Sequence, residues 1–300
     1  MWALFGLVSA LFLGFYDIFK KQSLNSNAVM PVLFFSTIAS SIIFIPLVIL
    51  SCTHPETISS IGLFVPELSF GEHLQVVLKS CIVVSSWVLS FFALKHLPIT
   101  IVTPIRATGP LWTLIGALII FKEQLNTYQW IGILLTLFFF YLFSTAGKLE
   151  GIHFKKNKWV FFIIGATILG AISGLYDKYI LTRIDRIAVQ AWFSFYQVLV
   201  LLPFVLLNEK IRKRKNIRFE WRWTIPFIGI FLVIADYFYF YALSNEDALI
   251  SVISALRRGS VLVTFLVGGL LFREKNLKKK GLYLLGILTG IVLITLGTIL

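Results

Sequence analysis

The sequence predicts an all-α membrane protein with ten transmembrane helices. Of its 300 residues, 58% are hydrophobic and 14% are charged, and the mean hydropathy is +0.89. Soluble domains average about 45–50% apolar and about 25% charged residues. A soluble fold of this length cannot bury so much apolar surface, and the composition also excludes a disordered chain, a collagen and a disulfide scaffold. Because one helical span uses about 20 apolar residues, ten spans account for roughly 200 residues.

Ten apolar runs define the expected helices, since each is too long for a barrel strand and none alternates with a period of two. The first five runs are Trp2–Phe19, Val29–Leu50, Leu74–Leu94, Pro98–Phe121 and Tyr128–Ala146. The second five are Trp159–Tyr176, Ile187–Leu207, Trp223–Leu243, Ala248–Phe272 and Gly281–Leu300. The first run lacks a basic segment before it and a cleavage site after it, so we expect it to be retained as a span.

The chain repeats itself, which predicts two homologous halves, residues 1–150 and 151–300. Shifts of 160 and then 151 residues superpose matching polar positions: Tyr16 on Tyr176, Asp17 on Asp177, Arg106 on Arg257, Glu123 on Glu274. Since each half holds five spans, an odd number, the second half must enter the membrane from the opposite side. Inverted repeats of this kind are typical of secondary transporters, whose substrate site lies near the midplane between the repeats.

Short motifs in both halves resemble those of the drug/metabolite transporter superfamily, in particular its ten-helix EamA-type members. They are Gly14-Phe15-Tyr16-Asp17, the pairs Ala93-Leu94 and Ala242-Leu243, and the triplets Phe121-Lys122-Glu123 and Phe272-Arg273-Glu274. The resemblance implies a multi-pass exporter or exchanger of metabolites, a group whose substrates include amino acids, drugs, nucleotide sugars and sugar phosphates. We expect such a protein in the bacterial plasma (inner) membrane.

The charge distribution bears on orientation and on partners. The formal net charge is +13, and most lysines and arginines lie in the first, third, fifth, seventh and ninth connections. The positive-inside rule would place these connections in the cytoplasm and both termini outside, whereas the resemblance implies cytoplasmic termini. Basic clusters between apolar runs indicate contact with lipid headgroups rather than with nucleic acid.

Charged residues inside the expected spans are the candidate substrate ligands. An arginine at the bilayer centre costs at least about 2.5–3.5 kcal/mol, so Arg106, Arg257 and Arg258 should face a polar interior. Asp236 either pairs structurally with Arg257 or Arg258, or contributes to binding. Three arginines against one aspartate leave a cationic surplus, which predicts an anionic substrate group, a carboxylate or a phosphate. Trp87, at the position that matches Asp236, and Tyr237 complete this candidate site.

Two symmetric dipeptides, Tyr16-Asp17 and Tyr176-Asp177, are expected at the ends of the first and sixth spans, near opposite interfaces. One interpretation is an aromatic belt with helix-end polar residues, paired with Lys20, Lys21 or Lys178. The other is that they gate the pathway or accept protons that couple transport to a gradient.

These features favour a secondary transporter of a small, anionic metabolite that acts by alternating access. A flippase of a phosphorylated lipid is the alternative, since an arginine surplus also fits a phosphate headgroup. No nucleotide-binding, hydrolase or protease motif is present, and the histidines lie outside the runs, so we expect neither an enzyme, a metal site nor a cofactor. A duplicated chain needs no second copy to complete a pathway, which predicts a monomer.

Overall fold

The computed structural model describes residues 2–109, 111–113, 115–116, 126–148, 156–214, 218–245, 253, 256–257, 259–272 and 277–299. Within these ranges the regular structure is entirely helical. The helices of the first half are α1 (Trp2–Leu24), α2 (Val29–Thr53), α3 (Pro55–Ser60), α4 (Phe70–His96), α5 (Ile99–Ala107) and α7 (Thr127–Lys148). Those of the second half are α8 (Lys158–Leu181), α9 (Arg186–Arg214), α10 (Thr224–Leu243), α12 (Gly259–Val263), η1 (Thr264–Gly268), α13 (Gly269–Leu271) and α14 (Leu277–Ile299).

The helices follow the expected apolar runs, with longer ends. By length and composition, five of the described helices are sufficient to cross a membrane: α2, α4, α8, α9 as far as Leu207, and α10. Shorter apolar stretches occupy Trp130–Phe139 and Gly259–Leu271. The protein is therefore all-helical and rich in apolar spans, while the count of ten stays a prediction.

Two helices run past their expected ends, and this changes the position of the symmetric dipeptides. α1 continues to Leu24 and α8 to Leu181, so Tyr16-Asp17 and Tyr176-Asp177 lie within helices rather than at their ends. Helix formation continues because the residues that follow, such as Lys20 and Lys178, are good helix formers with no proline or glycine among them. The expectation that these dipeptides end their helices is therefore wrong, while their place relative to the membrane interfaces stays a prediction.

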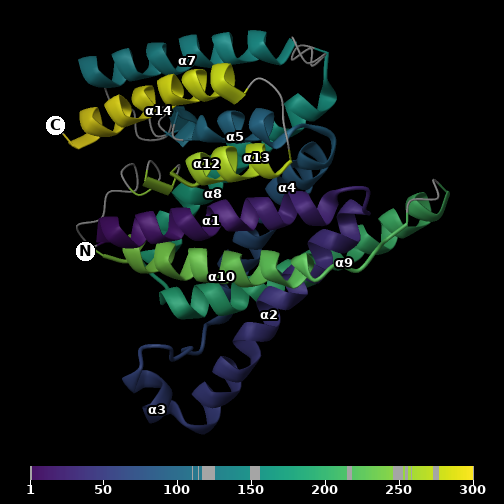
Figure 1. Ribbon diagram of the computed structural model, residues 1–300. Coiled ribbons are helices and arrows are strands. Elements are labelled where there is room, and N and C mark those ends of the chain that lie inside the picture. The colour runs from purple at the N-terminus through teal and green to yellow at the C-terminus, as the bar shows by residue number, and fades with distance from the viewer. Residues whose placement is uncertain are drawn as a thin grey trace.

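Helix packing has an approximate two-fold pattern. α1 packs on α10 as α8 packs on α4, and α2 packs on α10 as α9 packs on α4. α1 also contacts α12 as α8 contacts α5, while α2–α9 and α7–α14 pair corresponding helices of the two halves. In Figure 1, α7 and α14 lie side by side at one edge of the bundle, and both chain termini lie at the same end of it. Exchanging the halves thus maps the most extensive of these helix contacts onto one another.

The α2–α10 contact depends on a glycine. Gly229 is buried in α10, and a Cβ placed on it would overlap the carbonyl oxygen of Ser36 and lie 2.8 Å from the backbone nitrogen of Ser40. Small residues let helices approach this closely in membranes, where dispersion contacts between helices supply much of the stability.

Gly229→Ala is therefore expected to destabilise the protein by about 1–3 kcal/mol, because a methyl group must push α2 away. Thermal unfolding in detergent measures the effect. Gly71→Ala is the matched control, since a Cβ on Gly71 meets nothing within 4 Å. Equal melting temperatures of the two variants would contradict the prediction.

The ninth apolar run is not a uniform α-helix. Between α12 and α13 it contains the π-helical turn η1, which contacts α1 and α5. π-Helical turns are rare and occur frequently beside functional sites. Here the turn follows directly on α12, whose Ser260 faces the cavity described next.

Candidate functional site

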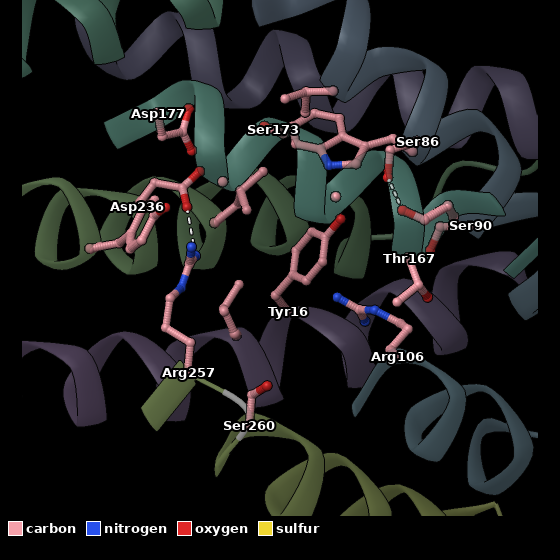
Figure 2. Close-up of a pocket in the computed structure, with 18 of the residues that line it drawn as sticks. Tyr16, Ser86, Ser90, Arg106, Thr167, Ser173, Asp177, Asp236, Arg257 and Ser260 are labelled. Carbon is pink, nitrogen blue, oxygen red and sulfur yellow. Dashed lines mark hydrogen bonds and ion pairs between the residues drawn. The ribbon is translucent and has the colours of Figure 1, made fainter. Parts of the chain in front are cut away.

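A cavity of about 190 Å³ lies inside the bundle, with walls from both halves of the chain. α1, α4 and α5 contribute side chains from the first half, and α8, α9, α10 and α12 contribute them from the second. Figure 2 shows Asp177, Asp236 and Arg257 at one end of the cavity and Arg106, Ser86, Ser90 and Thr167 at the other, with Tyr16 between them.

One end of the cavity holds a group of charges that we call the Asp17 cluster: Asp17, Lys20 and Arg106. Arg106 Nη1 contacts both carboxylate oxygens of Asp17, and Lys20 Nζ lies 3.4 Å from Asp17 Oδ1. The spacing of three residues on α1 brings Lys20 to the same face as Asp17. Asp17 and Lys20 are only 4% and 1% exposed, so a single buried carboxylate serves two cations.

Lys20 has weak contacts besides the shared carboxylate. Its Nζ donates to Ser90 Oγ at 3.4 Å and to Tyr16 Oη at 3.5 Å, and it lies 4.7 Å from the ring centroids of both Tyr16 and Phe91. Aromatic faces attract a cation but do not neutralise it. The ammonium group of Lys20 therefore lines the cavity with only part of its charge compensated.

The other end holds a second group, which we call the four-charge cluster: Lys79, Asp177, Asp236 and Arg257. Lys79 contacts Asp177, and its Nζ lies 4.3 Å and 5.0 Å from the ring centroids of Phe193 and Phe240. Arg257 Nη2 donates to Asp236 Oδ1 at 2.9 Å. Two bases and two acids make this end formally neutral.

Arg257 is incompletely bonded. Its guanidinium lies 3.9 Å from the ring centroid of Tyr239, and among the residues that the structure describes its buried Nε–H finds no hydrogen-bond acceptor. Arginine and carboxylate pair most strongly through two parallel hydrogen bonds. The single bond to Asp236 therefore leaves part of the hydrogen-bonding capacity of Arg257 unused.

Similarity to known proteins places the chain in a family. The model of the EamA-like transporter family matches residues 1–145 and again residues 157–296. The chain belongs to the EamA-like transporter family. It is accordingly a multi-pass membrane transporter of the drug/metabolite transporter superfamily, as the sequence motifs predicted.

No curated protein matches this EamA protein in sequence. One solved structure, a crystal structure of a protein, has a TM-score of 0.66 at 13% identity and covers 98% of this chain and 96% of that one. At this identity the likeness shows the fold alone. It extends over nearly the full length of both chains, so the fold described here is shared from end to end.

The structure brings together most of the predicted substrate ligands of this EamA protein. The expected contact between Asp236 and Arg257 is confirmed, and Trp87 and Arg106 line the same cavity. The count of three arginines against one aspartate did not include Asp17 of α1, which contacts Arg106. Arg258 lies outside the described residues.

Tyr237 is displaced from its expected place by helix geometry. It packs against Phe238 and Tyr241, and among the described residues Tyr239 lines the cavity instead. Successive residues of a helix point about 100° apart, so Asp236 and Tyr239, three apart, share a face that Tyr237 leaves. Tyr239 and not Tyr237 therefore lines this cavity, and a role of either residue in substrate binding stays a prediction.

Three residues of the symmetric dipeptides, Tyr16, Asp17 and Asp177, are buried, and Tyr176 is partly exposed. Tyr16 and Asp177 line the cavity, Asp17 is buried beside it, and Tyr176 Oη donates to the backbone oxygen of Gln75 at 3.2 Å. The expected Asp17–Lys20 pair is confirmed, whereas Asp177 pairs with Lys79 of α4. A role of these residues in gating or coupling stays a prediction.

Sequence reasoning missed two cavity lysines, Lys20 and Lys79. Lys79 stands within the third expected span, where a lysine is as costly as an arginine, so its position alone is a detectable signal. Lys20 lies just outside the expected first span, and it belongs to a helix that lines the cavity only because α1 is longer than expected. The hydroxyl-bearing residues Ser86, Ser90, Thr167 and Ser173 gave no signal, since such residues are common in transmembrane helices.

Proposed function

We propose that this EamA protein is a secondary-active exporter or exchanger that carries a small metabolite with an anionic group. Ten spans in two inverted repeats enclose the cavity, and the repeats move relative to one another to open it to alternate sides. The two-fold pattern of helix contacts and the double match of the family model support this architecture. Substrate sites at the interface of inverted repeats are typical of such transporters.

The observation that carries the anionic character is the shared carboxylate of the Asp17 cluster. Lys20 and Arg106 both contact Asp17, and both face the cavity. Lys20 shares its carboxylate with Arg106 and is almost fully buried, and a substrate carboxylate or phosphate would give its ammonium group a second anionic partner. Ser90, whose hydroxyl oxygen accepts from Lys20, lines the cavity beside this end and can donate its hydrogen to the same anion.

The rest of the proposal follows from the shape of the site. The first half contributes Trp87 and Arg106 and the second half contributes Asp236 and Arg257, so one chain forms the whole cavity and a monomer suffices. Tyr16 and Asp177, from the two corresponding Tyr-Asp dipeptides, face the cavity and are the candidate gating residues. We place the protein in the bacterial inner membrane, with the basic connections on the cytoplasmic side.

Arg106→Gln is expected to abolish most transport, because the change removes a guanidinium group that faces the cavity, while Lys20 still contacts Asp17. The substrate is first sought by thermal-shift measurements with amino acids, organic acids, sugar phosphates and lipid phosphates, since a ligand that binds the native state raises its apparent stability. Flux of the stabilising compound in proteoliposomes then measures transport.

Three outcomes decide the proposal. Flux of a small anion that Arg106→Gln abolishes supports it. Stabilisation and translocation restricted to lipid phosphates would favour the flippase instead. Unchanged flux in Arg106→Gln, or a substrate without an anionic group, would contradict the anionic assignment.

A further inference from the structure

The four-charge cluster contains two carboxylates and two cations that admit two complete pairings. In the structure Lys79 pairs with Asp177 and Arg257 pairs with Asp236. The carboxylate of Asp236 is also attracted by Lys79 and repelled by Asp177, and all four side chains line one cavity. The alternative, Lys79 with Asp236 and Arg257 with Asp177, leaves no charge unpaired either.

The internal repeat identifies the alternative pairing as the one that the first half already has. Asp177 corresponds to Asp17 and Arg257 to Arg106. Arg106 contacts Asp17, so the corresponding contact in the second half would join Arg257 to Asp177. Instead Arg257 contacts Asp236, whose counterpart in the first half is the uncharged Trp87. The two halves therefore hold their corresponding arginines in different arrangements.

The present pairing also ties the halves together. Lys79 lies on α4 of the first half and Asp177 on α8 of the second, so their contact crosses the boundary between the halves. Asp236 and Arg257 both belong to the second half. A relative movement of the halves must break or re-form the Lys79–Asp177 contact, and the unbonded Nε–H of Arg257 is a donor available to Asp177 when that happens.

We propose that Lys79, Asp177, Asp236 and Arg257 exchange partners when the transporter changes the side to which its cavity opens. In the state seen here the pairs are Lys79–Asp177 and Arg257–Asp236. In the other state they are Lys79–Asp236 and Arg257–Asp177. The inference rests on the proposed alternating access and adds the contacts that distinguish its two states. Because each state has two ion pairs, neither is heavily favoured, which a two-state transporter requires.

Double variants that leave one acid and one base test the exchange, because each remaining pair exists in only one state. Lys79→Gln with Asp236→Asn leaves Arg257 and Asp177, which pair only in the other state. Lys79→Gln with Asp177→Asn leaves Arg257 and Asp236, which pair in the present state. The two variants carry the same number of charges and differ only in which aspartate remains.

A second set exchanges the base. Arg257→Gln with Asp236→Asn leaves the present pair Lys79–Asp177, and Arg257→Gln with Asp177→Asn leaves Lys79–Asp236. The same aspartate substitution thus favours opposite states in the two sets. If the aspartates had a merely structural role, their substitution would give no such reversal. If a variant of one set fails to fold, the difference in state between the two variants of the remaining set still tests the exchange of partners.

Pulsed electron paramagnetic resonance on the full chain in lipid nanodiscs reports the state. One spin-label pair uses the exposed native Cys52, in the last turn of α2, with Thr182→Cys, directly after α8. The other uses Asn25→Cys with Lys156→Cys, on the connections that follow α1 and precede α8. Each pair joins the two halves at one end of the bundle, and native cysteines that are not labelled become serine. Opening at one end should lengthen one distance while the other shortens.

We expect the ratio of the two states to differ by at least about ten-fold between the members of each set, in opposite directions in the two sets. Equal ratios within the sets, or the same direction in both sets, would overturn the exchange. The wild-type chain separates this failure from that of the proposed function. Transport with opposite distance changes in the wild type, but no reversal in the variants, refutes the exchange alone. One fixed distance at each end, without transport, refutes alternating access itself.

Discussion

Asp17→Asn is expected to destabilise the folded protein by about 3–5 kcal/mol, the cost of leaving a buried charge without its partner. Asp17 is the carboxylate that Lys20 contacts in the described part of the chain, and it also contacts Arg106 through both oxygens. Asparagine is nearly isosteric but uncharged, so two cations would lose one shared counter-ion at once. The loss should appear as a large fall in melting temperature, or as failure to recover folded protein.

Two companion variants remove a cation instead of the carboxylate and serve as controls. Arg106→Gln and Lys20→Gln each leave Asp17 with one cation, so each should melt well above Asp17→Asn. Adding Lys20→Gln to Asp17→Asn should recover part of the lost stability, because Lys20 is the more deeply buried of the two cations, with 2% of its side chain exposed against 25% for Arg106. A melting temperature of Asp17→Asn equal to that of the wild type would show that the Asp17 cluster does not depend on this carboxylate.

Lys20→Gln is expected to weaken binding of the anionic substrate by about 10-fold to about 100-fold. Hydrogen bonds to charged groups contribute about 1.5–3 kcal/mol, and an anion in the cavity would meet the ammonium of Lys20 directly. Isothermal titration calorimetry, or the thermal-shift midpoint of the best ligand from the screen, measures the change.

Lys21→Gln is the matched control for this prediction. Lys21 is the next residue of the same helix, but its Nζ donates to the backbone oxygens of Leu94 and Leu97 at 2.8 Å and 2.7 Å, and it does not line the cavity. Its removal should leave the affinity within a few-fold of the wild type. If both lysine variants bind the anion as the wild type does, Lys20 is no part of the site.

Much of the fold is predictable because it depends on the apolar composition of the chain and on the length and spacing of its apolar runs. The apolar runs indicate where helices lie, since backbone groups in a membrane must bond within their own segment. Asp236 and Arg257 were predictable partners because a charge within a span needs one and their helices are neighbours in sequence. The position of Asp17 was not predictable, since nothing in the local sequence says that α1 continues five residues beyond Phe19.

The sequence by itself determined the helical membrane architecture, the duplication and the family, because hydropathy and repeated polar residues are properties of the chain alone. The tertiary structure decided which charges meet. Lys79 and Asp177 are 98 residues apart and Arg106 and Asp17 are 89 apart. Their contacts depend on how α4 and α5 pack against α8 and α1. Hydrogen-bonded ion pairs need their charged atoms within about 3–4 Å, so only the folded arrangement fixes the partners and, with them, the charges at each end of the cavity.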